Sequence, residues 1–202
     1  MPILQERQYR ELIPFTLGGE VKRLDSAYYV EGYAAKYDPY VLYETEDGPV
    51  YEEFQRGCFI GTDMSDVIMQ YDHAGKVLAR MSSGTLIVEP DEVGLFMAAD
   101  LSKSTAAREM FEEITNKLVT KMSWGFIPGE YHYDKERRTI VHTSIKKIFD
   151  VSAVSLPAND NTNIQARSFA DGVICKLTEE LRAKELKNLA LKTATLIKLG
   201  GL

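Results

Sequence analysis

The chain has 202 residues, 45% hydrophobic and 27% charged, a composition typical of one globular domain with a smaller additional segment. Its net charge of −6 argues against nucleic acid as a partner, because phosphate binding needs a basic surface. The sequence has neither a signal peptide nor about 18 consecutive apolar residues, and its two cysteines are far apart, so we expect no membrane span, secretion or disulfide.

Between residues 28 and 169, short segments rich in β-branched and aromatic residues alternate with clusters of Gly, Pro, Asp and Asn, as is typical of strands. The expected strands are residues 28–38, 66–73, 84–90, 93–101, 121–127, 138–145 and 148–157. Two hairpins are expected, with turns at residues 90–93 and 134–138. The fold class is therefore mainly β (α+β).

One helix is expected near residues 104–118, with Ser104 as its N-cap. Its apolar face would carry Ala107, Phe111, Ile114 and Leu118. Beyond Ala170 the Leu, Lys, Ala and Glu content predicts an amphipathic helix that ends at Gly200 and Gly201. We therefore divide the chain into a domain at 1–170 and a helical appendage at 171–202, which would bind a partner protein in a groove, be removed, or pack back on the domain.

Ser123 is the first candidate functional residue. Strand alternation places Met122 and Trp124 on one face of the strand at 121–127, and Ser123 with Gly125 on the other. A serine followed on its own face by glycine suits a nucleophile that a strand presents to a substrate. The alternative is an ordinary serine that faces solvent.

His73 ends the apolar segment 66–73 just before a turn marked by Gly75. Imidazole suits proton transfer near neutral pH, so His73 is the natural group to take a proton from a serine hydroxyl. The alternative is a surface-turn histidine that bonds to Asp72 or water. His132 and His142 lie in the second expected hairpin, where they are interpreted as ordinary strand residues.

Asp150 is a carboxylate inside an otherwise apolar strand segment. It shares one face of that strand with Ile148, Ser152 and Val154. Burying a carboxylate without a partner costs several kcal/mol, so we expect a hydrogen bond to it. A histidine N–H is one suitable donor, and a salt bridge to Lys146 or Arg138 is the alternative.

Five segments, in this order, resemble the prohead (capsid maturation) serine protease family of tailed bacteriophages. They are VEGYAAKYD (30–38), YEEFQRGCF (51–59), QYDHAGKVLARMSSGTLIVEPDEVGLFMAADL (70–101), KMSWGFIPGEY (121–131) and FDVSAVSLPANDNT (149–162). Five ordered pieces are far more specific than any one of them. The family is similar in fold to herpesvirus assemblin, so the resemblance implies a closed or nearly closed, antiparallel-rich β-barrel with flanking helices.

The resemblance implies that Ser123 is the nucleophile, His73 its general base and Asp150 the orienting third member. The chain departs from the family at Asp150, where glutamate is more typical. Herpesvirus enzymes use a second histidine in that role, so His142 is the alternative third member.

For the backbone donors that stabilise the oxyanion, the similarity to the herpesvirus fold suggests Ala158 and Asn159, and Gly125 is a further candidate for oxyanion or substrate binding. It also implies that the enzyme acts inside the assembling prohead in the host cytoplasm and cuts the major capsid protein or its scaffold. The resemblance is also compatible with cleavage of the chain by itself and with a homodimer. No cofactor or metal is expected, because neither His-Glu-x-x-His nor paired Cys-x-x-Cys occurs.

Two other interpretations compete with the protease. One is a non-catalytic capsid-assembly scaffold module on the same fold, since a fold does not fix a function. The other is a β-barrel binding module unrelated to phage. In that module Ser123 and His73 would lie far apart, whereas a protease needs their side chains within about 3 to 4 Å.

Overall fold

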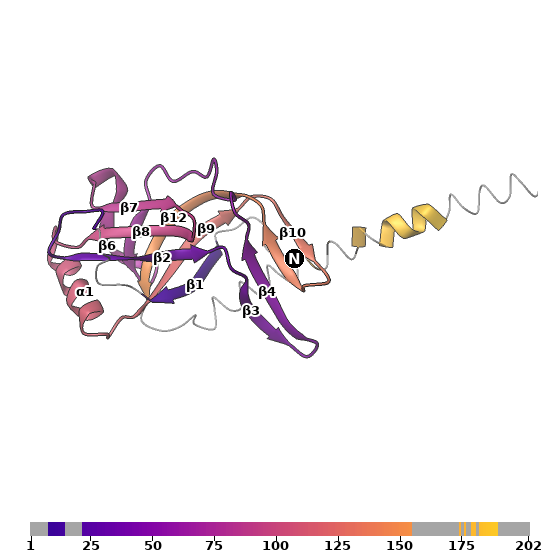
Figure 1. The fold of residues 1–202 in the computed structure, drawn as a ribbon, viewed down its shortest axis with the longest axis horizontal. Helices are drawn as coiled ribbons and strands as arrows, with labels where there is room; N and C mark the ends of the chain where they lie inside the picture. The colour runs from indigo at the N-terminus through magenta and orange to yellow at the C-terminus, as the bar shows by residue number, and fades with distance from the viewer. Residues whose placement is uncertain are drawn as a thin grey trace, which may run out of the picture.

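The computed structural model describes residues 8–14 and 22–154, and near the C-terminus residues 174, 176, 179, 180 and 182–189. Up to residue 154, these parts of the chain are mainly β, as the sequence predicts (Figure 1). The strands are β1 (Gln8–Pro14), β2 (Tyr29–Lys36), β3 (Tyr40–Thr45), β4 (Gly48–Phe54), β5 (Ile68–Tyr71), β6 (Ala74–Arg80), β7 (Leu86–Pro90), β8 (Gly94–Asp100), β9 (Lys121–Pro128), β10 (Tyr131–Asp134), β11 (Thr139–His142) and β12 (Ile145–Val154). The helices in this part are the 3-10 helix η1 (Met81–Ser83) and α1 (Thr105–Thr115).

The strands form three sheets, with orders β1-β9-β12-β5-β6, β10-β11-β4-β3 and β2-β8-β7. No described sheet closes on itself, so the predicted closed or nearly closed barrel is wrong for this part of the chain. The five-stranded and three-stranded sheets stay separate because no described ladder joins β6 to β7, which η1 separates along the chain, or β1 to β2. Figure 1 shows α1 and the strands β3, β4 and β10 at opposite ends of the body.

Both predicted hairpins are confirmed. The turn between β7 and β8 is held by Asp91, whose Oδ1 accepts hydrogen bonds from the backbone N–H groups of Val93 (2.8 Å) and Gly94 (3.1 Å). In the turn between β10 and β11, Asp134 Oδ1 accepts a hydrogen bond from the backbone N–H of Glu136 at 3.0 Å. The aspartates terminate these strands because their side chains bond the backbone locally.

A cluster of aromatic side chains fixes β9 from one side. Trp124 and Phe126 stack with ring centroids 4.1 Å apart, and Phe54 of β4 meets Trp124 edge to face at 5.2 Å. All three residues are fully buried. Such aromatic pairs add to the free energy of burial and favour one arrangement of the rings. The packing of these rings therefore fixes the strand that carries Ser123 on its core-facing side.

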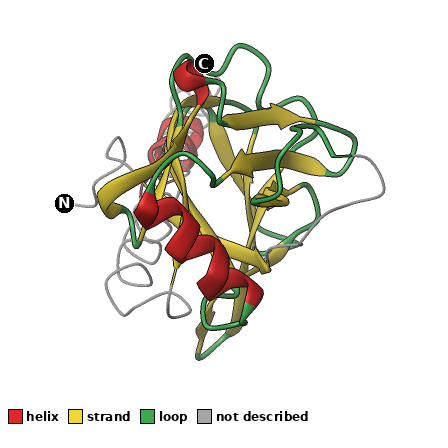
Figure 2. Ribbon diagram, turned by 90° about the vertical axis from the view of Figure 1, so that its left-hand side faces the viewer, coloured by secondary structure: helices red, strands yellow, loops and turns green. Residues whose placement is uncertain are grey.

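Helix α1 begins where the sequence predicts, because Ser104 Oγ accepts a hydrogen bond from Ala107 N at 3.1 Å. Figure 2 shows the helix in front of the strands, at the end of the body that faces the viewer. Its buried residues are Ala107, Met110 and Ile114. Leu118 was predicted on this face, but it is 72% exposed, because the helix ends at Asn116 and Lys117 adopts a left-handed conformation (φ 60°).

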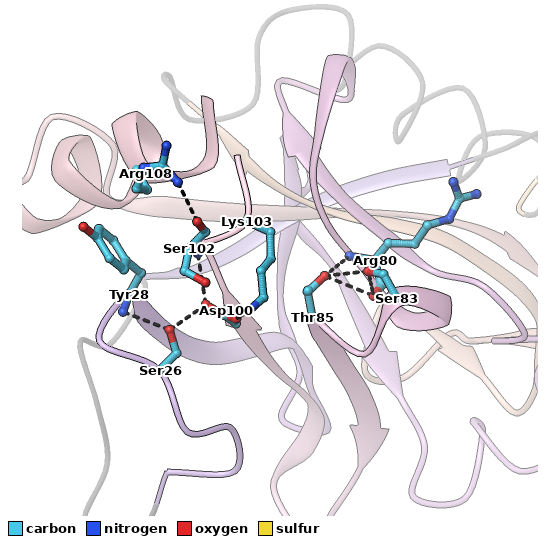
Figure 3. A network of polar contacts seen from close by, with 9 residues as sticks. All are labelled: Ser26, Tyr28, Arg80, Ser83, Thr85, Asp100, Ser102, Lys103 and Arg108. Carbon is cyan, nitrogen blue, oxygen red and sulfur yellow. Dashed lines mark hydrogen bonds and ion pairs between the residues drawn. The ribbon is translucent and has the colours of Figure 1, made fainter. Parts of the chain in front are cut away.

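Polar bonds fix the segment between β8 and α1 (Figure 3). Asp100 Oδ1 accepts hydrogen bonds from Ser26 Oγ at 2.5 Å and from Ser102 N at 3.0 Å. In the same view, Arg80 N donates to Thr85 Oγ1 at 2.9 Å across the turn between β6 and β7. The Asp100 bonds fix the turn that leads into α1, and β9 is the next strand after that helix.

The described residues near the C-terminus are helical. Lys176 and Glu180 line a hollow together with Tyr131 and His132 of β10, and Figure 1 shows residues 182–189 farther from the sheets. Residues 182–189 are all exposed, including Leu186 and Leu189 at 68% and 62%. These two leucines therefore do not pack back on the domain. The predicted helix end at Gly200 and Gly201, and the proposed boundary near residue 170, lie outside the described residues.

Candidate active site

Ser123 lies in the middle of β9, on the face opposite the aromatic cluster. The predicted alternation is confirmed, since Trp124 and Phe126 belong to the core. Ser123 is nevertheless only 3% exposed, so the alternative of a solvent-facing serine is wrong. Its register partners are Ser152 of β12 on one side and Glu11 of β1 on the other.

His73 comes from the tight turn between β5 and β6. Tyr71 and Ala74 are paired, so Asp72 and His73 alone form the loop. Both have positive φ angles, 46° and 58°, as a two-residue type I′ turn requires. Residues other than glycine adopt this conformation at a cost that surrounding bonds must offset. One such bond runs from Asp72 N to Ala153 O of β12, at 2.9 Å.

A β-bulge determines which face of the sheet the Asp150 side chain occupies. The register of β12 against β9 shifts between Ile148 and Asp150, which makes Phe149 an extra residue. Ile148 and Val151 therefore both reach the core, whereas Asp150 and Ser152 face the opposite side. The predicted face shared by Asp150 and Ile148 is wrong for this reason, and the face shared with Ser152 remains.

The hairpin and the bulge bring the three predicted side chains together. His73 Nε2 lies 2.6 Å from Ser123 Oγ, and His73 Nδ1 lies 2.6 Å from Asp150 Oδ1. The Asp150 side chain is fully buried and that of His73 is 16% exposed. The imidazole of His73 therefore bridges two buried groups. It is not a surface-turn histidine whose partners are limited to Asp72 or water.

These contacts specify a direction for a proton. With Asp150 accepting from Nδ1–H, the lone pair of Nε2 faces the Ser123 hydroxyl, which can then donate to it. A hydroxyl, an imidazole and a carboxylate in line are the arrangement that activates a serine. The alternative salt bridges of Asp150 are not formed: Arg138 bonds Thr45 and backbone carbonyl groups of the β3–β4 turn, and among the described ion pairs none joins Lys146 to Asp150.

A family model described as caudovirus prohead serine protease matches residues 19–173. The chain belongs to this family. His73, Ser123 and Asp150 all lie within the matched range. No curated protein and no solved structure matches the chain, so the likeness to herpesvirus assemblin stays a prediction.

The assignment of oxyanion donors remains a prediction. Gly125 lies two residues after Ser123 in β9, with Asp150 as its register partner in β12. Ala158 and Asn159 lie outside the described residues. No helix in the described part of the chain has the length and apolar composition that crossing a bilayer requires. Among the same residues, no group of three His, Cys, Asp or Glu side chains could hold a metal ion.

Two other reactive side chains, those of His142 and Cys58, lie away from this arrangement. His142, the alternative third member, is fully buried and its Nε2 lies 2.9 Å from Glu52 Oε1. Cys58 is also buried, and burial raises the pKa of its thiol to about 12. The thiol therefore stays protonated near neutral pH and is a poor nucleophile.

His142 belongs to a buried polar cluster that was not predicted from the sequence. Arg10 of β1 donates to Glu52 of β4 through Nε (2.5 Å) and Nη2 (2.8 Å), and the Tyr40 hydroxyl also donates to Glu52. Burial alone would raise the pKa of Glu52, but the Arg10 guanidinium and the bond to His142 outweigh it and hold this pKa below its ordinary value. Arg10 thereby links β1, the neighbour of the Ser123 strand, to a second sheet.

Replacing Glu52 with alanine should lower the free energy of unfolding by about 3–5 kcal/mol, because it leaves the Arg10 charge buried without its carboxylate. Urea unfolding at neutral pH measures this loss. Glu53→Ala is the matched control, since Glu53 pairs with Arg137 at the surface and should contribute less than about 1 kcal/mol. Equal losses in both variants would contradict a structural role for the buried cluster.

The contribution of Glu52 should also depend on pH. A carboxylate whose pKa is lower in the folded state contributes its full stabilisation above its ordinary pKa, here near 4.5, and loses it as the pH falls toward the folded value. The difference in unfolding free energy between wild type and Glu52→Ala should be constant from about pH 7 to about pH 5 and narrow below that range. A difference unchanged at about pH 3 would contradict this assignment.

Proposed function

We propose that this protein is a serine endopeptidase that cleaves capsid or scaffold protein during prohead maturation. The observation that carries the proposal is the pair of 2.6 Å contacts that join Ser123 Oγ, the His73 imidazole and Asp150 Oδ1. Membership of the caudovirus prohead serine protease family supports the same function. A non-catalytic scaffold module has no need of a buried hydroxyl, imidazole and carboxylate in line.

In the proposed mechanism His73 Nε2 takes the Ser123 proton as the hydroxyl oxygen attacks a peptide carbonyl carbon. The negative charge of Asp150 stabilises the imidazolium that forms, and its bond to Nδ1–H keeps the ring in the required tautomer. The imidazolium then protonates the leaving amine, and the peptide C–N bond breaks to leave an acyl-enzyme. Water hydrolyses the ester with His73 again acting as the base.

The tetrahedral intermediate needs hydrogen-bond donors for its oxyanion. We assign this role to backbone N–H groups of the segment that follows β12, at Ala158 and Asn159, with Gly125 allowing the substrate to approach β9. The support is positional: β12 carries Asp150 and runs beside Ser123, and its last residue, Val154, pairs with Lys121, two positions before Ser123.

The proposed substrate is the major capsid protein or its scaffold, inside the prohead in the host cell, and the chain can also cut itself. Co-expression with the capsid protein of the same phage tests this. We expect a shortened capsid protein by mass spectrometry with wild type, and full-length protein with Ser123→Ala. Full-length capsid protein in both samples would contradict the assigned substrate, and its shortening in both would contradict the assigned nucleophile.

A fluorophosphonate probe tests the chemistry without any knowledge of the substrate. The Ser123 oxygen would bond to phosphorus, fluoride would leave, and His73 would take the proton. Peptide mapping should place the label on Ser123 alone, and Ser65→Ala, which alters an exposed serine bonded to Asp63, should label like wild type. Absence of label on folded wild type would favour the non-catalytic scaffold module.

A further inference from the structure

Ser152 occupies a central place beside the proposed catalytic residues. It lies on β12 two residues after Asp150, on the same face, and is fully buried. Across the ladder its register partner on β9 is Ser123, and in the other direction it is Gln70 of β5. The side chain therefore stands between the nucleophile strand and the strand that leads to His73.

The hydroxyl of Ser152 forms a hydrogen bond with the Asp150 carboxylate. Ser152 Oγ donates to Asp150 Oδ1 at 2.6 Å, the same oxygen that lies 2.6 Å from His73 Nδ1. Two short, charge-assisted bonds thus converge on one buried carboxylate oxygen. Hydrogen bonds to an ionised group are shorter and stronger than those between neutral groups, and a carboxylate this deeply buried depends on them.

We infer that Ser152 is a positioning residue, whose hydroxyl fixes the Asp150 carboxylate in the orientation that holds the His73 ring toward Ser123. This inference rests on the proposed function, because the orientation matters to a reaction only if Ser123 is the nucleophile. A carboxylate on a strand can rotate about its Cα–Cβ and Cβ–Cγ bonds. The hydrogen bond between Asp150 and His73 restrains part of this rotation. The hydrogen bond from Ser152, on the same strand as Asp150, restrains the rotation that remains.

Ser152→Ala should lower kcat about tenfold, because it removes one bond to a charged group, while KM changes less than about twofold. We expect kcat to change more than KM because Ser152 acts through Asp150 and does not contact the peptide. Ser152→Thr keeps the hydroxyl and should recover most of the lost kcat. Val154→Ala is the matched control: it truncates a buried side chain on the same strand face without removing a donor to Asp150, and should leave kcat within about twofold.

A readout independent of turnover is the NMR signal of the His73 Nδ1 proton, which a short bond to a carboxylate moves far downfield. The chain has three histidines, and His73→Gln identifies the signal by its loss. We expect the signal to shift or vanish in Ser152→Ala and to stay in place in Val154→Ala. The measurement can be repeated in Ser123→Ala, where no turnover occurs.

The two readouts separate this inference from the proposed function. A wild-type protein that neither cleaves nor reacts with the probe would remove the proposed function, yet the NMR signal would still report whether Ser152 holds the Asp150–His73 contact. An unchanged signal together with an unchanged kcat in folded Ser152→Ala would overturn the inference and leave the proposed nucleophile intact. A loss of kcat equal in Ser152→Ala and Val154→Ala would also overturn it, since packing alone would then explain the effect.

Discussion

Ser123→Ala is expected to lower the rate of peptide cleavage by about 10⁵-fold, because it removes the atom that forms the acyl-enzyme. The residual rate would come from binding and oxyanion stabilisation, which do not need the hydroxyl. The measurement is kcat on a peptide spanning the capsid-protein cleavage site, or single-turnover processing of the capsid protein. Folding should be preserved, since the change removes one hydroxyl while Trp124 and Phe126 still hold β9 in the core.

The matched control is Ser65→Ala, which changes an exposed serine in the segment before β5 and should cleave at the wild-type rate. Circular dichroism and urea unfolding of both variants check that activity is not lost with the fold. Cleavage by folded Ser123→Ala at more than about a tenth of the wild-type rate would exclude Ser123 as the nucleophile.

The strands that the sequence predicted carry mostly apolar residues at their buried positions. In β9 the residues Trp124 and Phe126 alternate with small ones, so both the strand and its inner face could be predicted. In β4 the buried positions are Val50, Glu52 and Phe54, and the glutamate interrupts the apolar alternation. Arg10 compensates for that glutamate from 42 positions away, and no local pattern reveals such a pair.

Strands β1 and β6 were missed for related reasons. The described buried side chains of β1 are Gln8 and Arg10, which are polar, so burial at these positions leaves no apolar pattern in the sequence. Strand β6 is the outer strand of its sheet, and its residues from Ala74 to Val77 are exposed. Strands at an edge bury little, and hydrophobic periodicity detects burial rather than pairing.

The three candidate site residues were assigned from resemblance, and their proximity depends on features that spacing cannot provide. His73 and Ser123 are 50 positions apart, and His73 and Asp150 are 77 apart. The turn that delivers His73 uses Asp72 and His73 at positive φ, where Asn-Gly would be the usual signal. The bulge at Phe149 turns Asp150 away from the core, and an alternating pattern assumes that no such extra residue exists.

Asp150→Asn is expected to lower kcat by about 10⁴-fold with the fold intact. Asparagine has nearly the same shape, but it lacks the charge that stabilises the imidazolium of His73. Its amide can also present N–H to Nδ1, which places the ring proton on Nε2, facing Ser123. A histidine in that tautomer cannot take the serine proton. The Ser123 hydroxyl would still be present, so slow labelling by the fluorophosphonate would separate this variant from Ser123→Ala.

The control for the charge is Asp66→Asn, which alters a carboxylate that pairs with Arg80 at 2.8 Å near the surface. It removes the same negative charge from the loop that leads into β5, so its kcat should stay within about twofold of wild type. If Asp150→Asn cleaved within about tenfold of wild type, the carboxylate would not be needed to orient His73. In that case the buried pair of His73 and Asp150 would serve the stability of the hairpin turn, which unfolding of the same variant would then show as a lower free energy.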